Sequence, residues 1–451
     1  MALEDLPTEI LLLILESLSS PVDLLSATRA SPVLHCTFIT YKKHLLRHNL
    51  LQAIHPACRA DVYSALDAQS IPKLITSGES LARIKSEGFS FFARDRGRRG
   101  SSGYQFKLDD EQVETLFRLH VGIERLIDCY CQWSLGNLQA HQVKPTQFDA
   151  NAVYPRADLS TTERVRLQRA FYRCDIHARF RQVLHLLSDN SSSLSYAQSV
   201  LSFVSQFAFH EFEEIFCVKQ FLAQYVRSLC ERVEDDFIAS FSPNALPGRG
   251  TKRQSAYKPP QTKNLYPDEL SFFTNKYRES QHADHVKFIT SYGLSYLLHL
   301  NQLGPRALKY AILESYADSL KDTVTDFINT CGLLIESCDK EERDTVLRGR
   351  LVSIPGDLVS SINLGWKWAT SFEEFPRPNS PAMFDLRNRG YVFWDQGRLQ
   401  ASGLVNEPVR VCIAAYYFPP GHEEPFLRPS VEDRFAGFEL DHKALTEWKD
   451  E

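Results

Sequence analysis

The sequence lacks the features that mark a membrane or secreted protein. No apolar run reaches the roughly 18 residues that a membrane-spanning helix needs, so we predict no transmembrane segment. Residues 1–15 contain acids and no basic residue, unlike a secretory leader. The 10 cysteines are scattered without regular spacing, which predicts reduced thiols rather than a disulfide framework. These absences predict residence in the cytoplasm or the nucleus.

The sequence also lacks an excess of basic residues. It contains 51 Lys and Arg against 56 Asp and Glu, for a net charge of −5. Proteins that bind nucleic acid generally carry a basic excess, so nucleic acid is not an expected partner. Two basic segments, residues 94–99 and 249–263, leave a polyanion-binding protein as the least favoured alternative.

No complete catalytic or cofactor motif is present. The string at 293–297 has the Gly-x-Ser of a nucleophile elbow but lacks the second glycine. His210 begins a string like that of zinc proteases, yet Glu214 occupies the position of the second histidine. His282 and His285 have no third ligand nearby in sequence and are interpreted as a polar surface. We therefore predict that the chain is not an enzyme and holds no cofactor or metal.

What the sequence does contain is enough apolar residues for a sizeable core. Its 451 residues are 43% hydrophobic and 12% aromatic, a composition and length that predict two or three globular domains.

The most informative stretch lies at the start of the chain, where a helix is predicted. Asp5 is a candidate cap and Pro7 suits a first helical turn. Glu9 lies near the N-terminus, where the helix dipole favours a negative charge. Six apolar residues then follow without a break at 10–15 and cover every direction around a helix. Both sides of this helix therefore need to be buried.

Two further helices are predicted within residues 20–45. Ser20 caps the first and Pro21 opens it, while Ser31 and Pro32 end it and open the second. Three such short helices bury too little apolar surface to be stable alone. Another protein, or the rest of this chain, must cover the remaining face.

One ordered set of residues in these helices forms a recognisable pattern. It comprises Leu6, Pro7, Glu9, Ile10, Ile14, Leu15, Leu18, Asp23, Leu24 and Leu25. This order resembles an F-box, whose members bind a Skp-family linker protein and, through that linker, join a cullin-RING ubiquitin ligase. The resemblance implies that these residues form the partner-binding site.

The resemblance has one departure. Many F-boxes carry a tryptophan in the third helix, and here Phe38 or Tyr41 takes that place. The alternative interpretation is that residues 6–25 pack against the rest of the same chain and need no partner.

The rest of the sequence predicts helices. Apolar residues recur at helical spacing in residues 56–68, 110–131, 160–187, 211–237, 286–300 and 306–331. Residues 409–413 alternate apolar residues with others, which predicts one short strand. The predicted fold is mainly α, with an N-terminal three-helix F-box followed by an irregular helical domain with little β near the C-terminus.

One predicted helix has an arginine-rich face. It comprises Arg164, Arg166, Arg169, Arg173, Arg179 and Arg181. We interpret this face as a solvated surface, with binding of phosphate or acidic segments as the alternative.

Composition divides the chain into successive parts. They are the F-box at 1–50, the first part of a helical body at 51–241, a basic proline-rich linker or disordered loop at 242–266, the second part of the body at 267–345 and an irregular C-terminal region at 346–451.

Three segments of the body and C-terminal region, residues 161–173, 213–218 and 386–399, resemble parts of large fungal families of F-box proteins. This resemblance implies no particular substrate. Within the last segment, residues 391–394 are chosen as a recognition surface, although core packing is the favoured use of their aromatic rings.

These observations predict the substrate-recruiting subunit of a Skp/cullin/F-box ubiquitin ligase. The N-terminal helices would bind the Skp-family linker, and through it a cullin, while the helical body would bind an unknown protein substrate. The alternative is an F-box scaffold that acts with the linker outside a ligase.

Overall fold

The fold is built from α-helices. The computed structural model describes residues 3–76, 108–139, 156–188, 209–241, 272, 281–319, 364–370 and 381–406. Within these ranges 86% of the residues are helical, in 14 α-helices without a strand, which confirms the predicted mainly α fold. The strand predicted at 409–413 and the linker predicted at 242–266 lie outside the described residues.

The first part of the chain forms four short α-helices. They follow the 3-10 helix η1 (Leu3–Asp5) and are α1 (Thr8–Ser17), α2 (Pro21–Ala30), α3 (Pro32–Thr40) and α4 (Lys42–Ala53). The single helix expected after Pro32 is therefore two helices, because the chain leaves helical geometry at Tyr41 with φ −109° and ψ 20°. Helix α4 runs across residue 50, where the F-box was expected to end.

The caps of these helices follow the sequence closely. Ser20 Oγ accepts the Val22 N–H at 3.2 Å, and Ser31 Oγ accepts the Leu34 N–H at 3.4 Å. Asp5, expected to cap α1, lies instead in η1, and Pro7 occupies the N-cap position without a side-chain hydrogen bond.

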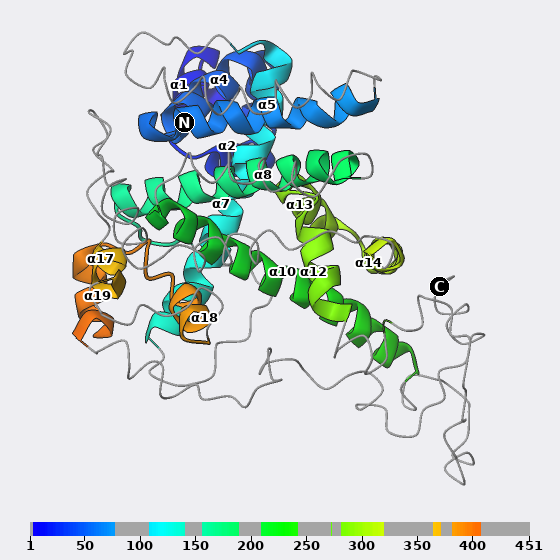
Figure 1. The fold of residues 1–451 in the computed structure, drawn as a ribbon. Helices are drawn as coiled ribbons and strands as arrows, with labels where there is room; N and C mark the ends of the chain where they lie inside the picture. Colours follow the sequence, from blue (N-terminus) through cyan, green and yellow to red (C-terminus); the bar gives the residue numbers. More distant parts are fainter. Residues whose placement is uncertain are drawn as a thin grey trace, which may run out of the picture.

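Three long helices form the centre of the body. After η2 (Pro56–Cys58) and α5 (Arg59–Thr76), the chain builds α7 (Asp110–Gln139), α8 (Thr161–Ser188) and α10 (Phe209–Phe241). Helix α8 packs against α5, α7 and α10. In Figure 1 the N-terminal helices and α19 lie on opposite sides of α8.

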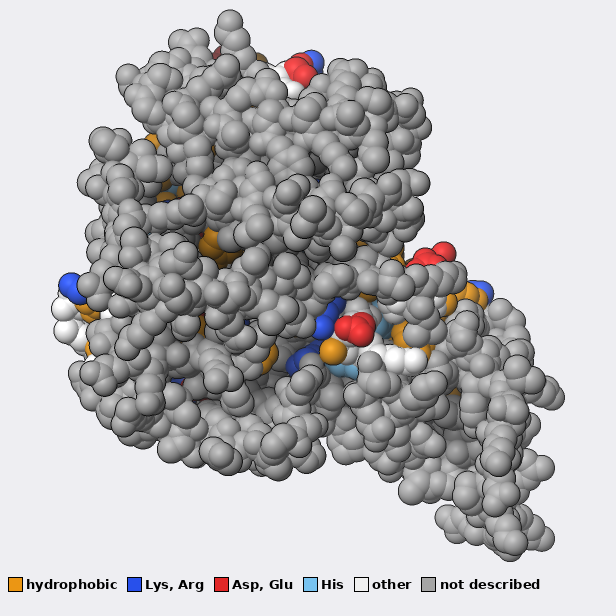
Figure 2. Space-filling model, viewed as in Figure 1, with side chains coloured by type: hydrophobic (Ala, Val, Ile, Leu, Met, Phe, Trp, Pro, Cys, Tyr) orange, Lys and Arg blue, Asp and Glu red, His pale blue; other side chains and the backbone are white. Residues whose placement is uncertain are grey.

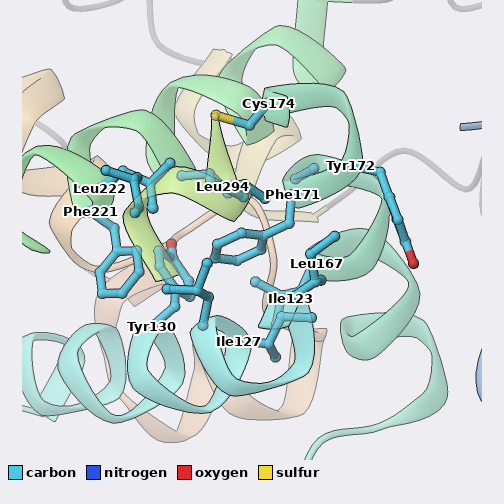
Figure 3. Packing of buried hydrophobic residues seen from close by; sticks show 14 of the residues in the cluster. Ile123, Ile127, Tyr130, Leu167, Phe171, Tyr172, Cys174, Phe221, Leu222 and Leu294 are labelled. Atoms are coloured by element: carbon cyan, nitrogen blue, oxygen red, sulfur yellow. The ribbon is translucent and has the colours of Figure 1, made fainter. Parts of the chain in front are cut away.

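The core lies between α7, α8 and α10. In Figure 3 side chains from these helices and from α13 point toward one another. Tyr130 makes edge-to-face contacts with Phe171 at 6.2 Å, Phe221 at 5.3 Å and Phe393 at 5.4 Å between ring centroids. Such pairs add about 0.5 to 1.5 kcal/mol each beyond the burial of apolar area. The cluster therefore joins a distant C-terminal residue to the three long helices.

The next part of the body is α12 (His282–Thr290), α13 (Leu294–Gln302) and α14 (Pro305–Ser319). The single helix expected at 286–300 is broken at Gly293, whose φ is 87°. The buried carboxylate of Asp175 on α8 accepts the Leu294 N–H at 2.7 Å and so caps α13. A side chain at position 293 would put Cβ 2.8 Å from Asp175 Oδ1, so glycine suits this position both in conformation and in space.

The described C-terminal elements are α17 (Leu364–Thr370), α18 (Pro381–Asn388), α19 (Gln396–Ala401) and η4 (Leu404–Asn406). Between α18 and α19, the side chains of Tyr391, Val392, Phe393 and Trp394 are all 0% exposed. The favoured interpretation, core packing of these rings, is confirmed, and their choice as a recognition surface was wrong.

The arginine face of α8 is largely buried, which corrects its interpretation as a solvated surface. Arg169 Nη2 donates to both carboxylate oxygens of Glu214, at 2.7 and 2.9 Å. Arg173 is 1% exposed and donates to Asp61 of α5 at 2.9 Å and to Glu211 of α10 at 2.8 Å. Acidic residues far away in sequence thus meet this face, which helical periodicity alone could not indicate.

Further ion pairs hold the C-terminal segment in place. Arg166 donates to Asp395 at 2.8 Å. Arg387 Nε donates to Glu213 at 2.6 Å, and Arg398 Nε donates to Glu163 at 2.8 Å. Burial alone would raise the pKa of Asp395, but hydrogen bonds from Ser160, Thr162 and Arg166 outweigh it and lower that pKa.

The two histidines interpreted as a polar surface are buried, so that interpretation was wrong. His282 is 1% exposed and His285 is 0% exposed. His285 Nε2 lies 2.9 Å from Ser315 Oγ of α14, and burial lowers the pKa of His285 to about 3. His285 is therefore neutral near pH 7.

Candidate partner-binding surface

Helix α1 has one face inside the protein and one outside. Leu11 and Leu15 are 3% and 0% exposed, whereas Ile10 and Leu13 are 42% and 58% exposed. A helix at the surface of a globular protein normally carries polar residues on the side that faces solvent. The rest of the described chain thus buries only one side of the apolar run.

Helix α3 also has an exposed apolar residue. It packs against α1. Ile39 is 57% exposed, and Tyr41, directly after α3, is 38% exposed. Phe38, the other residue considered in place of the F-box tryptophan, is 7% exposed and belongs to the core. We call the exposed sides of α1 and α3, with Ile10, Leu13 and Ile39, the α1/α3 face.

The predicted partner-binding residues fall into three groups by burial. Leu15 and Leu24 are 0% exposed, so they hold the helices together and cannot touch a partner in this fold. Leu6, Ile14, Leu18 and Leu25 are half-buried. The exposed members are Pro7, Glu9, Ile10 and Asp23.

The prediction omitted Leu13 and Ile39, which are more exposed than Ile10, the most exposed large apolar residue in it. The signal for Leu13 was present, because it follows Ile10 by three residues and so shares its side of a helix. For Ile39 the sequence offered only an apolar residue in a predicted helix. Which side of α3 faces outward depends on how α1, α2 and α4 pack around it.

The α1/α3 face carries little charge. The exposed residues of α1 and α3 are Thr8, Glu9, Ile10, Leu13, Ser17, Pro32, His35, Cys36, Ile39 and Thr40. Among them Glu9 is the one acid, and His35 is the one histidine. The centres of protein interfaces are likewise depleted of charged residues.

Helix α4 fixes this face to the body. Lys42 donates to Glu114 of α7 at 3.0 Å, and Lys43 donates to Asp110 at 2.6 Å. The hydrogen bond from Lys43 lowers the pKa of Asp110, and the bond from Lys42 lowers the pKa of Glu114. On the other side, His44 Nε2 lies 2.6 Å from Glu16 Oε1 of α1. These exposed pairs add to the packing of α4 against α7, which orients the face relative to the long helices.

Asp23 of α2 faces a different neighbour. Its carboxylate lies 3.3 Å from the Arg156 guanidinium, in the segment that leads into α8. Both side chains are about half exposed (52% for Asp23, 51% for Arg156), so this pair contributes little stability. It adds a link between the predicted F-box helices and the body.

The described residues do not assemble a metal centre. They contain no group of three or more His, Cys, Asp and Glu side chains that could hold a metal ion. The zinc-protease-like string beginning at His210 places Glu211 and Glu214 against arginines of α8. His120 is buried with its Nδ1 2.7 Å from the Tyr172 hydroxyl, as expected for a core histidine.

None of the helices in the described ranges combines the length and apolar character of a membrane span. No protein-family model, curated protein or solved structure matches this chain. The interpretation of the N-terminal helices therefore depends on their own sequence and geometry.

Proposed function

We propose that this chain is an F-box substrate-recruiting subunit of a ubiquitin ligase that binds a Skp-family linker through the α1/α3 face. One observation carries the proposal. Seven large apolar side chains are exposed in the described residues, and five of them lie within residues 8–53: Ile10, Leu13, Ile39, Tyr41 and Leu51. The other two are Tyr310 and Phe384. Exposed apolar groups gathered in one region mark interaction surfaces more often than scattered ones do.

Binding at this face would follow ordinary interface physics. Each Å² of apolar surface removed from water stabilises a complex by about 25 cal/mol before the costs of association. A few desolvated apolar residues usually supply most of the net affinity. Leu13 and Ile39, at 58% and 57% exposure, have the most surface to lose and are the expected main contributors.

The chemistry in this proposal belongs to other subunits. The chain contributes proximity, because a substrate bound to the body would have a high effective concentration near the ligase. The packing of α4 against α7 supports this role, since it holds the proposed linker-binding helices in one orientation relative to the body.

The proposal is tested by co-expression with a Skp-family protein, followed by gel filtration of the purified chain. We expect a stable one-to-one complex. A monodisperse chain that does not bind the linker would overturn the proposal. If the chain binds the linker but no cullin co-purifies with the complex, the chain would instead be a scaffold that acts outside a ligase.

The matched control is Phe384→Asp on α18. Phe384 is 44% exposed, close to the 42% of Ile10, so the same change is made to an equally accessible side chain elsewhere. Ile10→Asp should weaken linker binding, whereas Phe384→Asp should leave it unchanged. Equal loss of binding in both variants would show that the effect is not specific to the α1/α3 face.

A further inference from the structure

A second group of partly exposed side chains lies on α12, α13 and α14. Three aromatic rings follow one another across the junction of α12 and α13. The ring centroids of Phe288 and Tyr292 are 5.2 Å apart, and those of Tyr292 and Tyr296 are 4.8 Å apart. None of the three side chains is fully buried. They form a continuous aromatic ladder at the surface.

Helix α14, which packs against α12 and α13, adds a further ring and two acids beside the ladder. Tyr310 is 37% exposed, and Glu314 and Asp318 are exposed. Their four-residue spacing places all three on one side of α14. In Figure 2 acidic and hydrophobic side chains reach the surface close together over the region where Figure 1 places these helices, with Lys, Arg and His side chains beside them.

The packing of α14 against α12 and α13 places the two acids on an element next to the ladder. Burial raises the pKa of Tyr296 to about 12, and the charges of Glu314 and Asp318 contribute to the rise. Lys287, which is adjacent to Phe288, is paired with Asp284 at 3.4 Å between Nζ and Oδ1.

We propose that this aromatic–acidic surface, comprising Phe288, Tyr292, Tyr296, Tyr310, Glu314 and Asp318, binds a basic peptide segment. Ring faces attract ammonium and guanidinium groups, and carboxylates at the edge of the ladder add charge attraction. The planar guanidinium of arginine also stacks on aromatic rings, so arginine should bind better than lysine. A nucleic acid is disfavoured here, because its phosphates would be repelled by the two acids.

This inference deepens the proposed function by naming the class of substrate that the ligase subunit would recruit. The surface lies on α12 to α14, whereas the linker would bind α1 and α3. The two activities can therefore be measured and lost separately.

The test is fluorescence anisotropy with the full chain in complex with the Skp-family protein, or alone if no complex forms. The probes are labelled Gly/Ser peptides that carry several arginines, several lysines or several glutamates. We expect binding in the order arginine, then lysine, with no binding of the glutamate peptide. Glu314→Gln combined with Asp318→Asn should weaken arginine-peptide binding at least about fivefold, as should Tyr292→Leu.

The control variant is Glu111→Gln, which removes one exposed negative charge from α7 and should leave peptide binding unchanged. Circular dichroism serves as the readout of folding in every variant, and linker binding is a second readout where the complex forms. Arginine-peptide binding that is unaffected by the Glu314/Asp318 change, or equal binding of the glutamate peptide, would overturn the inference. If linker binding fails while peptide binding responds as expected, only the proposed function is lost.

Discussion

The guanidinium of Arg169 on α8 is enclosed with the carboxylate of Glu214 on α10, and both side chains are almost inaccessible to water, at 6% and 1% exposure. Burial alone would lower the pKa of Arg169, but the charges of Glu214 and Glu211 and the hydrogen bonds to Glu214 together outweigh it, so the pKa of the guanidinium is raised. The pair is one of several that join α8 to α5, α10 and the C-terminal segment. Part of the contact between the long helices is therefore ionic.

Removing one member of this pair should destabilise the protein strongly. Arg169→Met leaves the Glu214 charge buried with less compensation, and we expect a loss of about 3 to 5 kcal/mol in the free energy of unfolding, measured in urea. The double variant with Glu214→Leu should recover much of that loss, because neither charge then remains.

Lys43 and Asp110 provide the matched control for this prediction. Their atoms are 2.6 Å apart, yet the side chains are 78% and 52% exposed, so Lys43→Met should cost far less stability than Arg169→Met. A similar cost at both sites would show that the α8 pair is not effectively buried.

Leu13 and Leu15 should separate binding from folding. The two residues are neighbours on α1, but their exposures are 58% and 0%. Leu13→Asp should change stability by no more than about 0.5 kcal/mol and weaken binding of a Skp-family protein at least about thirtyfold. Leu15→Asp should destabilise the fold by at least about 3 kcal/mol, because it buries an unpaired charge.

Thermal unfolding measures the change in stability of the two variants, and isothermal titration calorimetry measures their affinity for the linker. Full linker affinity in the Leu13 variant would contradict the assigned face.

The stability of the protein should depend on pH through His285. Its pKa is about 3 in the folded chain, against an ordinary value of 6.5, so the unfolded chain binds the proton more readily. The stability contributed by neutral His285 is complete above pH 6.5 and is lost as pH falls toward 3, by up to about 1.4 kcal/mol per pH unit. His285→Gln should reduce this slope, measured as urea unfolding at a series of pH values between 7 and 5. An unchanged slope would show that His285 is protonated or hydrated in the folded protein.

Gly293 should be intolerant of a side chain. Its φ is 87°, and a Cβ atom would lie 2.8 Å from Asp175 Oδ1, the atom that caps α13. Gly293→Ala should therefore cost about 1 to 3 kcal/mol of stability. Gly397→Ala is the control, because nothing lies within 4 Å of its added Cβ and the position is helical. That change should be neutral or slightly stabilising. If the two alanine variants lost the same stability, the role of Asp175 as the cap of α13 would be contradicted.

The local features of this protein follow from its sequence. Caps at Ser20 and Ser31, the helix starts at Pro21 and Pro32 and the long helix from Asp110 all depend on residues within one or two turns of each other. The apolar residues predicted to line that long helix, Val113 and Tyr130 among them, are buried for the same reason. The sequence also indicated that an apolar run at 10–15 must have two apolar sides.

Only the tertiary structure decided which sides face inward. Periodicity placed the arginines of α8 on one face but could not bring Asp61, Glu211 and Glu214 to it, since those acids come from other helices. In the same way, Leu15 became core and Leu13 became surface through the packing of α3 and α4. Local hydrogen bonds and φ preferences act over a few residues, so short sequence motifs are enough to predict them. Burial depends on contacts between residues tens to hundreds of positions apart, and a single sequence does not show which of them meet.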